Sequence, residues 1–160
     1  LDHSVNDRVA LSEEMDFLRQ YLKLESLRFD GGIHFTVDAD RALLDEDVEV
    51  PALLVQPFVE NAVWHGLAHR SGEKRVAVRF TQVDGIVECT VEDNGLGRGF
   101  QPGPKPDGHK SVGIQLTNER LQLLAFRLGE EGRAHYADLH TTDGRAAGTL
   151  VTLKLDVQQR

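Results

Sequence analysis

The sequence feature that most constrains the fold is a β-hairpin signal at Asp84–Gly85. Apolar and polar residues alternate on both sides of this dipeptide, over 76–80 and 86–92, as they do in strands with one buried face. Asp-Gly is favoured in the tight turn between antiparallel strands, because both turn residues adopt positive φ. A second pair of strands is predicted at 136–142 and 149–157, again around an Asp-Gly turn.

Consecutive strands that pair as hairpins favour an α+β protein, with helices covering one face of the sheet. The first predicted helix spans 12–29, with Ser12 as its N-cap and Gly31–Gly32 ending it. Its broad apolar stripe packs either on the domain's own sheet or on a partner helix upstream, and both remain open. A short strand at 33–37 follows, and then an acid-rich link over 38–50 with helical leanings.

Two further helices are predicted. The first covers 52–67 and contains Pro57, which either begins the regular helix in its first turn or kinks it. The second covers 112–128, after a long glycine- and proline-rich stretch over 93–113. A loop of this length inside a compact domain is usually functional or mobile, and we expect it to act as a lid.

Length and charge limit the classes of protein to consider. The 160 residues suffice for one domain, and a net charge of −8 repels polyanions, so no nucleic-acid partner is expected. A small phosphate ligand remains possible, since backbone N–H groups and a metal reverse the sign of charge locally. The single Cys89 lies in an alternating strand and is predicted to be a buried structural thiol. With no membrane span or signal peptide evident, we interpret the chain as a cytoplasmic piece of a longer protein.

Three clusters of residues carry candidate chemistry, and the first lies on the middle helix. Asn61 and His65 are four residues apart, so they project from the same helix face. Glu60 and Asn61 offer oxygen ligands, which Mg²⁺ prefers together with phosphate oxygens and water. Taken alone, this cluster is more simply interpreted as a solvated polar face.

The second cluster is Asp93-Asn94-Gly95-Leu96-Gly97, directly after a predicted strand. An Asp at a strand end can accept a hydrogen bond from an amino group, and glycines two apart let the backbone approach a flat ligand closely. Asp-Asn-Gly is also ordinary turn chemistry, which is the simpler interpretation of the motif in isolation.

The third cluster is Val112-Gly113-Ile114-Gln115-Leu116, at the predicted start of the last helix. Free N–H groups at a helix N-terminus suit a phosphate. The loop before it can add positive charge from Arg98, Lys105, His109 and Lys110. Taken alone, this pattern is more simply interpreted as a helix that begins after a long loop.

Taken in order, the clusters and the Gly148–Thr149 that opens the last strand resemble the ATP-binding domain shared by gyrase, Hsp90, histidine kinases and MutL. The closer resemblance is to sensor histidine kinases of the LytS type. It is carried by 54–66 (LVQPFVENAVWHG), by 11–22 (LSEEMDFLRQYL) and by 113–121 (GIQLTNERL), and it covers about 9–157.

The resemblance implies a two-layer α/β sandwich of the Bergerat type, with a mixed, mostly antiparallel sheet and Mg·ATP bound between sheet and helices. Asn61 resembles the Mg²⁺ ligand, and the neighbouring Glu60 holds an acidic position of catalytic interest. Asp93 resembles the carboxylate that binds the adenine amino group, and Thr149 the hydroxyl that assists it. The remaining implied nucleotide-binding residues are His65, Gly95, Gly97, Lys110, Gly113 and Leu116.

Three positions depart from the wider histidine kinase pattern. Gln115 replaces the second glycine of the lid motif, and Trp64 stands where many histidine kinases have a phosphate-facing Lys. Pro57 replaces a polar residue, as is usual in the LytS type. These departures concern the phosphates more than the adenine. They keep open a degenerate binding module, and a serine kinase resembling anti-sigma factors is a second alternative.

The resemblance also implies partners for this segment. Residues 1–30 are predicted to form a connecting segment with a helix, and 31–160 the ATP-binding domain. The family's phosphoacceptor His lies in a motif like His-Phe-x-Phe-Asn, which is absent from this chain; His3 lacks that context. We therefore expect transfer of the γ-phosphoryl of ATP to a histidine on upstream dimerisation helices, in a homodimeric parent that serves a response regulator.

Overall fold

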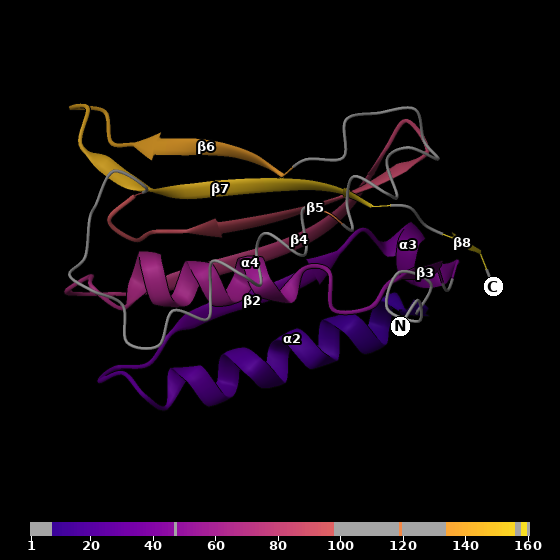
Figure 1. Ribbon diagram of the computed structural model, residues 1–160, viewed down its shortest axis with the longest axis horizontal. Helices are drawn as coiled ribbons and strands as arrows, with labels where there is room; N and C mark the ends of the chain where they lie inside the picture. The colour runs from indigo at the N-terminus through magenta and orange to yellow at the C-terminus, as the bar shows by residue number, and fades with distance from the viewer. Residues whose placement is uncertain (1–7, 47, 98–118, 120–133, 156–157, 160) are drawn as a thin grey trace.

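A five-stranded sheet forms one layer of the molecule in the computed structural model, which describes residues 8–46, 48–97, 119, 134–155 and 158–159 (Figure 1). Across the sheet the order is β2, β4, β5, β7, β6. Only β2 and β4 pair in parallel, while the other neighbours are antiparallel. The bounds are β2 (His34–Ala39), β4 (Arg75–Val83), β5 (Ile86–Asp93), β6 (His135–His140) and β7 (Ala146–Leu155). The mixed, mostly antiparallel sheet is as predicted.

Both predicted hairpins are confirmed. Asp84 and Gly85 have φ of 52° and 78°, so both turn residues adopt the positive values that a tight Asp-Gly turn requires. β4 and β5 pair directly up to this turn, at Val83 and Ile86. β6 and β7 form the second hairpin, with a register irregularity between Leu139 and His140.

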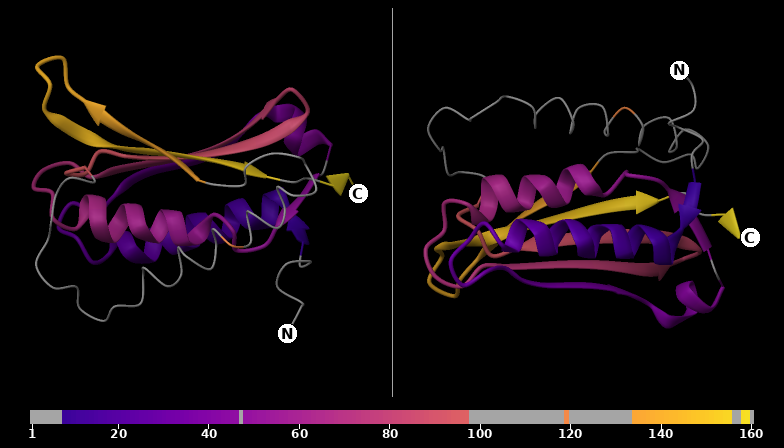
Figure 2. Two further views of the ribbon diagram at one scale, coloured as in Figure 1. Left: turned by 45° about the horizontal axis from the view of Figure 1, so that its top comes forward. Right: turned by 90° about the horizontal axis from the view of Figure 1, so that it is seen from below.

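Helices cover one face of the sheet, as Figure 2 shows. They are α2 (Leu11–Ser26), the short α3 (Arg41–Asp45), and α4 (Gln56–Asn61), which continues as the π-helical turn η1 (Ala62–Leu67). Pro57 lies in the first turn of α4, where a missing backbone N–H costs nothing, so it begins the helix rather than kinking it. The two-layer α+β architecture is therefore as expected.

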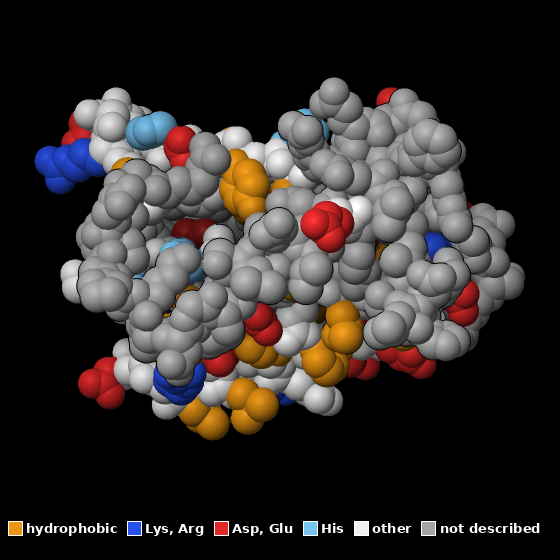
Figure 3. All heavy atoms as spheres, viewed as in Figure 1, with side chains coloured by type: hydrophobic (Ala, Val, Ile, Leu, Met, Phe, Trp, Pro, Cys, Tyr) orange, Lys and Arg blue, Asp and Glu red, His pale blue; other side chains and the backbone are white. Residues whose placement is uncertain are grey.

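The buried face of α2 settles where that helix packs. Leu11, Met15, Leu18 and Leu22 join the same core as the inward side chains of the sheet. The core therefore includes α2, and the alternative of an upstream partner for this face is not needed. Phe17 and Leu24 of α2, and Leu27 directly after it, are exposed. Figure 3 shows hydrophobic side chains along the lower edge of the molecule, over α2. No helix of the described ranges is long and apolar enough to cross a bilayer.

Cys89 is fully buried in β5, as predicted for a structural thiol. Burial is the main reason that the pKa of its thiol lies well above the usual range, and the nearby Glu14 acts in the same direction. The thiol is therefore protonated and unreactive near neutral pH.

The predicted ends of the first helix are wrong by one to three residues. The helix begins at Leu11, with Ala10 and not Ser12 in the N-cap position, and it ends at Ser26. The hydroxyl of Ser26 accepts a hydrogen bond from the N–H of Ile33 at 2.7 Å, which holds the turn into β2. Gly31 and Gly32 then carry the chain round with φ of 80° and 70°.

A second, three-stranded sheet was not predicted. It orders β1 (Arg8–Ala10), β3 (Val48–Pro51) and β8 (Gln158–Gln159), with β3 in the middle. The predicted link over 38–50 thus contains both α3 and most of β3. β1 and β8 are short, and their pairing brings together segments far apart in sequence, so local pattern gives little sign of them. The predicted helix over 112–128 lies outside the described residues, apart from Glu119.

Candidate functional site

The structure brings several of the predicted site residues together in one pocket between the helical layer and the sheet. The described part of its lining consists of Asn61, Ala62, His65, Gly66, Asp93, Gly97, Tyr136 and Thr149. These come from α4 and η1 on one side and from the ends of three strands on the other. Lys110, Gly113 and Leu116, together with Gln115 and the predicted lid, lie outside the described residues.

The helical side of the pocket depends on a change of helix type. α4 ends at Asn61, and η1 begins at the next residue. In η1 the N–H of Ala68 donates to the carbonyl of Val63, five residues back, at 2.9 Å. Such single π-helical turns occur often at functional sites. Asn61 and His65 nevertheless both line the pocket, as their spacing predicts.

Two neighbours on this helix lie differently. Glu60 is not part of the described lining, and its Oε1 accepts a hydrogen bond from the side-chain amide of Gln56 at 3.1 Å. Trp64 is also absent from that lining; its indole lies under the guanidinium of Arg28, 4.0 Å from the ring centroid. Position 64 therefore contributes no side chain to the described part of the pocket. The catalytic interest of Glu60 stays a prediction.

Asp93 is the buried acidic group of the pocket. It is the last residue of β5, and only 6% of it is exposed. Its Oδ1 accepts a hydrogen bond from the N–H of Gly95 at 2.9 Å, and Thr149 is its register partner on β7. Burial raises the pKa of Asp93 to about 6, although the N–H groups of Gly95 and Thr149 oppose the shift. A carboxylate has acceptor capacity beyond these contacts, so this one can receive a ligand N–H.

Three glycines allow the chain to crowd around this carboxylate. A Cβ on Gly66 would lie 2.6 Å from Oδ1 of Asp93, and one on Gly95 would lie 2.3 Å from backbone atoms of Gly66. A Cβ on Gly148 would lie 1.8 Å from the carbonyl oxygen of Asp93. Each distance is far below any normal contact. At Gly95 and Gly148 the obstructing atoms are backbone atoms, so only glycine fits there, while a Cβ at position 66 would displace the Asp93 carboxylate. Gly66 and Tyr136 were not among the predicted site residues.

Asn94, the neighbour of Asp93, has a structural role. Its Oδ1 accepts a hydrogen bond from the N–H of Arg75 at 2.7 Å, and its Nδ2 donates to the carbonyl of Glu73 at 3.0 Å. The Asp93-Asn94-Gly95 motif therefore has both roles considered from the sequence: it forms a turn, and it supplies a carboxylate to the pocket. Asn94 anchors the turn on β4, while Asp93 lines the pocket.

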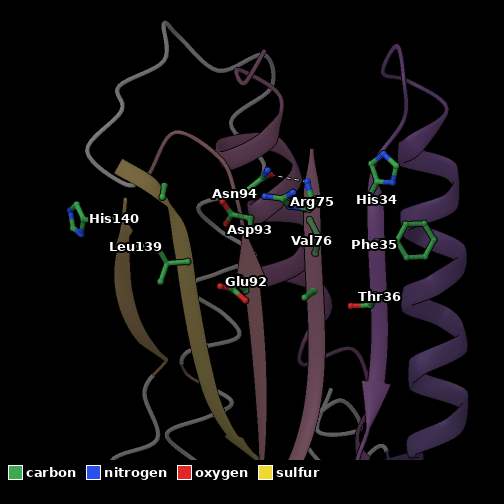
Figure 4. Close-up of a pocket in the computed structure, with 12 residues that line it drawn as sticks. His34, Phe35, Thr36, Arg75, Val76, Glu92, Asp93, Asn94, Leu139 and His140 are labelled. Carbon is green, nitrogen blue, oxygen red and sulfur yellow. Dashed lines mark hydrogen bonds between the residues drawn. The ribbon is translucent and has the colours of Figure 1, made fainter. Parts of the chain in front are cut away.

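A larger hollow of about 800 Å³ lies beside the same strand ends (Figure 4). It is lined by side chains such as His34, Thr36, Arg75, Glu92 and His140. Two of its polar residues are engaged in structural contacts: the guanidinium of Arg75 pairs with Glu73 at 3.0 Å, and the side chain of Asn94 accepts a hydrogen bond from the N–H of Arg75. Asp93 borders both spaces, but only the smaller pocket brings it together with Asn61, His65 and Thr149 among the described residues, so the smaller pocket is the better candidate site.

Metal binding by protein groups alone is not supported in the described ranges. They contain no group of three or more His, Cys, Asp or Glu side chains that could hold an ion. Mg²⁺ commonly needs only one or two protein oxygens when phosphates and water complete its shell. The amide oxygen of Asn61 in the pocket lining suits that arrangement.

The chain is similar in sequence to sensor histidine kinases. It is 32% identical to the sensor protein LytS of Oceanobacillus iheyensis over 136 residues, which are 79% of this chain and 22% of that protein. It is 30% identical to LytS of Bacillus subtilis over 159 residues, covering 94% of this chain and 25% of the relative. The chain thus spans about a quarter or less of these curated relatives. No family model matches it.

Solved structures show the same fold. The catalytic domain of the histidine kinase ThkA superposes with a TM-score of 0.57 and 13% identity, covering 93% of this chain and 94% of that one. The histidine kinase domain of a blue-light-activated kinase from Erythrobacter litoralis gives a TM-score of 0.54 and 21% identity, covering 88% and 59%. The chain therefore has the fold of a histidine kinase catalytic domain and belongs to the LytS-type family of sensor histidine kinases.

Proposed function

We propose that this chain binds Mg·ATP and is the catalytic domain of a sensor histidine kinase, located in the cytoplasm. The observation that carries the proposal is the buried Asp93 carboxylate, which shares one pocket with Asn61 and Thr149. The sensor histidine kinases among its relatives support the same activity. The phosphoryl acceptor is a histidine on dimerisation helices outside this chain, and a response regulator receives the group afterwards.

In this proposal Asp93 accepts a hydrogen bond from the exocyclic amino group of adenine. Thr149 is 8% exposed and is the register partner of Asp93 between β5 and β7; its hydroxyl assists directly or through water. The glycine contacts around Asp93 fix the carboxylate before the ligand arrives, which lowers the cost of binding. Gly95 and Gly97 support the base.

The phosphates are assigned to the other end of the pocket. Asn61 holds the Mg²⁺ ion, and His65 lies one turn further along the same side of the helix. Lys110, Gly113 and Leu116 complete this end in the proposal. Bound Mg²⁺ neutralises charge on the transferred phosphoryl group, and the protein contributes mainly by positioning. Glu60 serves as an acidic neighbour of the metal site.

Labelling with γ-labelled ATP tests the kinase assignment. The isolated chain should acquire no acid-labile label, because it lacks the acceptor motif of the family. With a fragment bearing the upstream helices added in trans, the label should appear on that fragment. A stoichiometric, acid-labile label on the isolated chain would contradict the assignment of the acceptor. Label on a serine of a partner protein would favour the serine kinase alternative.

Asn61→Ala should weaken binding of Mg·ATP far more than binding of metal-free ADP. The amide acts through the ion, so its loss matters only when the ion is present; a change of about tenfold or more is expected. Calorimetry with and without EDTA gives the comparison. An equal loss for both ligands would make Asn61 a structural residue and return the first cluster to a polar helix face.

Adenine nucleotide affinity should fall as the pH drops through about 6. The raised pKa means that Asp93 becomes protonated in this range, and a neutral acid is the poorer acceptor. The same raised pKa affects the stability of the ligand-free protein. The pKa of Asp93 is higher in the folded than in the unfolded chain, so the contribution of this residue to stability is greatest at a pH below its unfolded-state pKa. That contribution is lost as the pH rises through about 6, where the buried carboxyl ionises. Asp93→Asn is the control, because titration of the nucleotide phosphates is common to both proteins. Parallel pH profiles would contradict the role of Asp93.

A further inference from the structure

A contact outside the described lining of the pocket joins the segment directly after α2 to the helix carrying Asn61. The guanidinium of Arg28 lies 4.0 Å from the centroid of the Trp64 ring. Arg28 follows the C-terminal end of α2, where its N–H donates to the carbonyl of Glu25 at 3.0 Å. A cation over an indole face is attracted by the ring quadrupole, and tryptophan is the strongest partner for it.

This contact has neighbours on both helices, and the side chain of Arg28 is itself 54% exposed. Glu25 pairs with Arg28 at 3.6 Å, and Trp64 packs partly buried against the core, as does Tyr21. Burial raises the pKa of Tyr21 well above its usual range, and the charges of Glu25 and Glu60 add to the shift. Tyr21 thus lies within electrostatic reach of both carboxylates. Tyr21, Glu25, Arg28 and Trp64 together form a cluster that joins the C-terminal part of α2 and the segment after it to the junction of α4 and η1.

A second contact joins the other end of α2 to the start of the same helical segment. Glu14 is 97% buried, and its Oε2 accepts a hydrogen bond from the N–H of Leu53 at 3.4 Å. Leu53 has a φ of 58°, an unusual value for a leucine, in the loop that leads into α4. The segment 53–64 is therefore contacted at its start by Glu14 of α2 and at its end by Arg28, directly after α2.

The position of Trp64 makes this contact relevant to the pocket. Trp64 lies three residues after Asn61 and directly before His65, and all three belong to the junction of α4 and η1. Asn61 and His65 line the pocket, whereas Trp64 is not part of the described lining and contacts Arg28. Single π-helical turns inside α-helices occur frequently at functional sites, and the side-chain contact of Trp64 is made from such a turn.

We propose that Arg28 and Trp64 are positioning residues that orient the turn bearing Asn61 and His65, so that α2 controls nucleotide affinity without touching the ligand. The part that concerns nucleotide affinity rests on the proposed function. The part that concerns the orientation of the turn does not. A displacement of α2 would reach the pocket through Trp64.

The first measurement is amide hydrogen exchange of the ligand-free protein. In Arg28→Ala, amides of 61–67 should exchange about threefold to tenfold faster relative to the core amides of β5, while Arg28→Lys, which keeps a cation, stays closer to the wild type. Arg19→Ala is the matched control. Arg19 lies within α2 and is an arginine too, but it donates to the carbonyl of Val37 on β2 at 2.6 Å. It should leave the relative exchange of 61–67 unchanged.

The second measurement is a double-mutant cycle for Mg·ATP affinity between Arg28→Ala and Asn61→Ala. Arg28→Ala alone should weaken binding about threefold to tenfold, and it should add little once Asn61 is gone, because it acts through that turn. Trp64→Phe should weaken binding less than Trp64→Leu. Additive effects in the cycle would overturn the proposal, as would unchanged exchange of 61–67 in Arg28→Ala. If the wild type bound no nucleotide, the proposed function would fail, while the exchange experiment would still decide the orientation of the turn.

Discussion

Replacing Asp93 by alanine should reduce the affinity for adenine nucleotides by about a hundredfold or more, while the protein stays folded. A site built around one buried acceptor loses the directional bond to the adenine amino group when that acceptor is removed. Stability should change much less, because the raised pKa shows that burial disfavours the ionised carboxylate of the free protein near neutral pH. Loss of binding without loss of stability distinguishes a ligand-binding group from a structural one.

Glu92→Ala provides the matched control for this variant. Glu92 precedes Asp93 on β5, but its exposed side chain lies beside the larger hollow of Figure 4. Its removal should leave nucleotide affinity within about twofold of the wild type, as expected for a solvated surface charge. The two variants are compared by calorimetry and by urea unfolding. Equal nucleotide affinity in Asp93→Ala and the wild type would remove the central contact of the proposed site.

Gly148→Ala should be the most destabilising single methyl addition in this region, costing about 3 kcal/mol or more. Its Cβ would lie 1.8 Å from the carbonyl oxygen of Asp93 and 3.0 Å from Cα of Asn94. The φ of 130° adds backbone strain for any residue with a side chain. Since the atoms in the way belong to the backbone of β5, they cannot move without shifting the strand pairing.

Gly144→Ala separates the two causes. Gly144 also has a positive φ, 86°, but no heavy atom lies within 4 Å of its added Cβ. This variant should cost about 1 kcal/mol, which is the usual penalty of the left-handed conformation without a collision. Urea unfolding of both variants gives the difference. Equal unfolding free energies would show that the close approach of β7 to Asp93 does not constrain the fold.

The sheet and its hairpins could be predicted because their signals are local. Alternation and the Asp84–Gly85 turn fixed the pairing of β4 with β5, and the turn residues have the positive φ that this chemistry implies. The small sheet of β1, β3 and β8 depends on contacts between distant segments, and its strands have two to four residues. Short segments of that kind have no periodicity to detect.

The helix boundaries show how packing overrides a local preference. Ser12 has the chemistry of an N-cap, yet the helix already begins at Leu11, which is buried in the core. Burial of that leucine contributes more than a single capping bond, since full burial of a leucine is worth about 1.5–3 kcal/mol against about 1 kcal/mol for a cap.

Residues whose own side chains suit a ligand could be singled out from the sequence. Requirements that arise where two distant segments of the chain touch could not. Asn61 and Asp93 were singled out by their residue types and positions, and Thr149 by the resemblance to LytS-type kinases; all three line one pocket, and their roles stay predictions. The need for glycine at position 66 comes from the approach of Asp93, which is distant in sequence. The direction of Trp64 likewise depends on Arg28 of the segment after α2. The residues around a position in the sequence do not show which distant residues will contact its side chain in the fold.

The most direct test of the account is a calorimetric titration of the wild-type chain with ATP and with GTP, each in the presence of Mg²⁺. The two ligands carry the same phosphates but differ at the base, where adenine offers an amino group and guanine a carbonyl that would face the Asp93 carboxylate. The account predicts saturable binding of one ATP per chain and no measurable binding of GTP at the same concentrations. Equal affinity for the two nucleotides, or no binding of ATP, would contradict it.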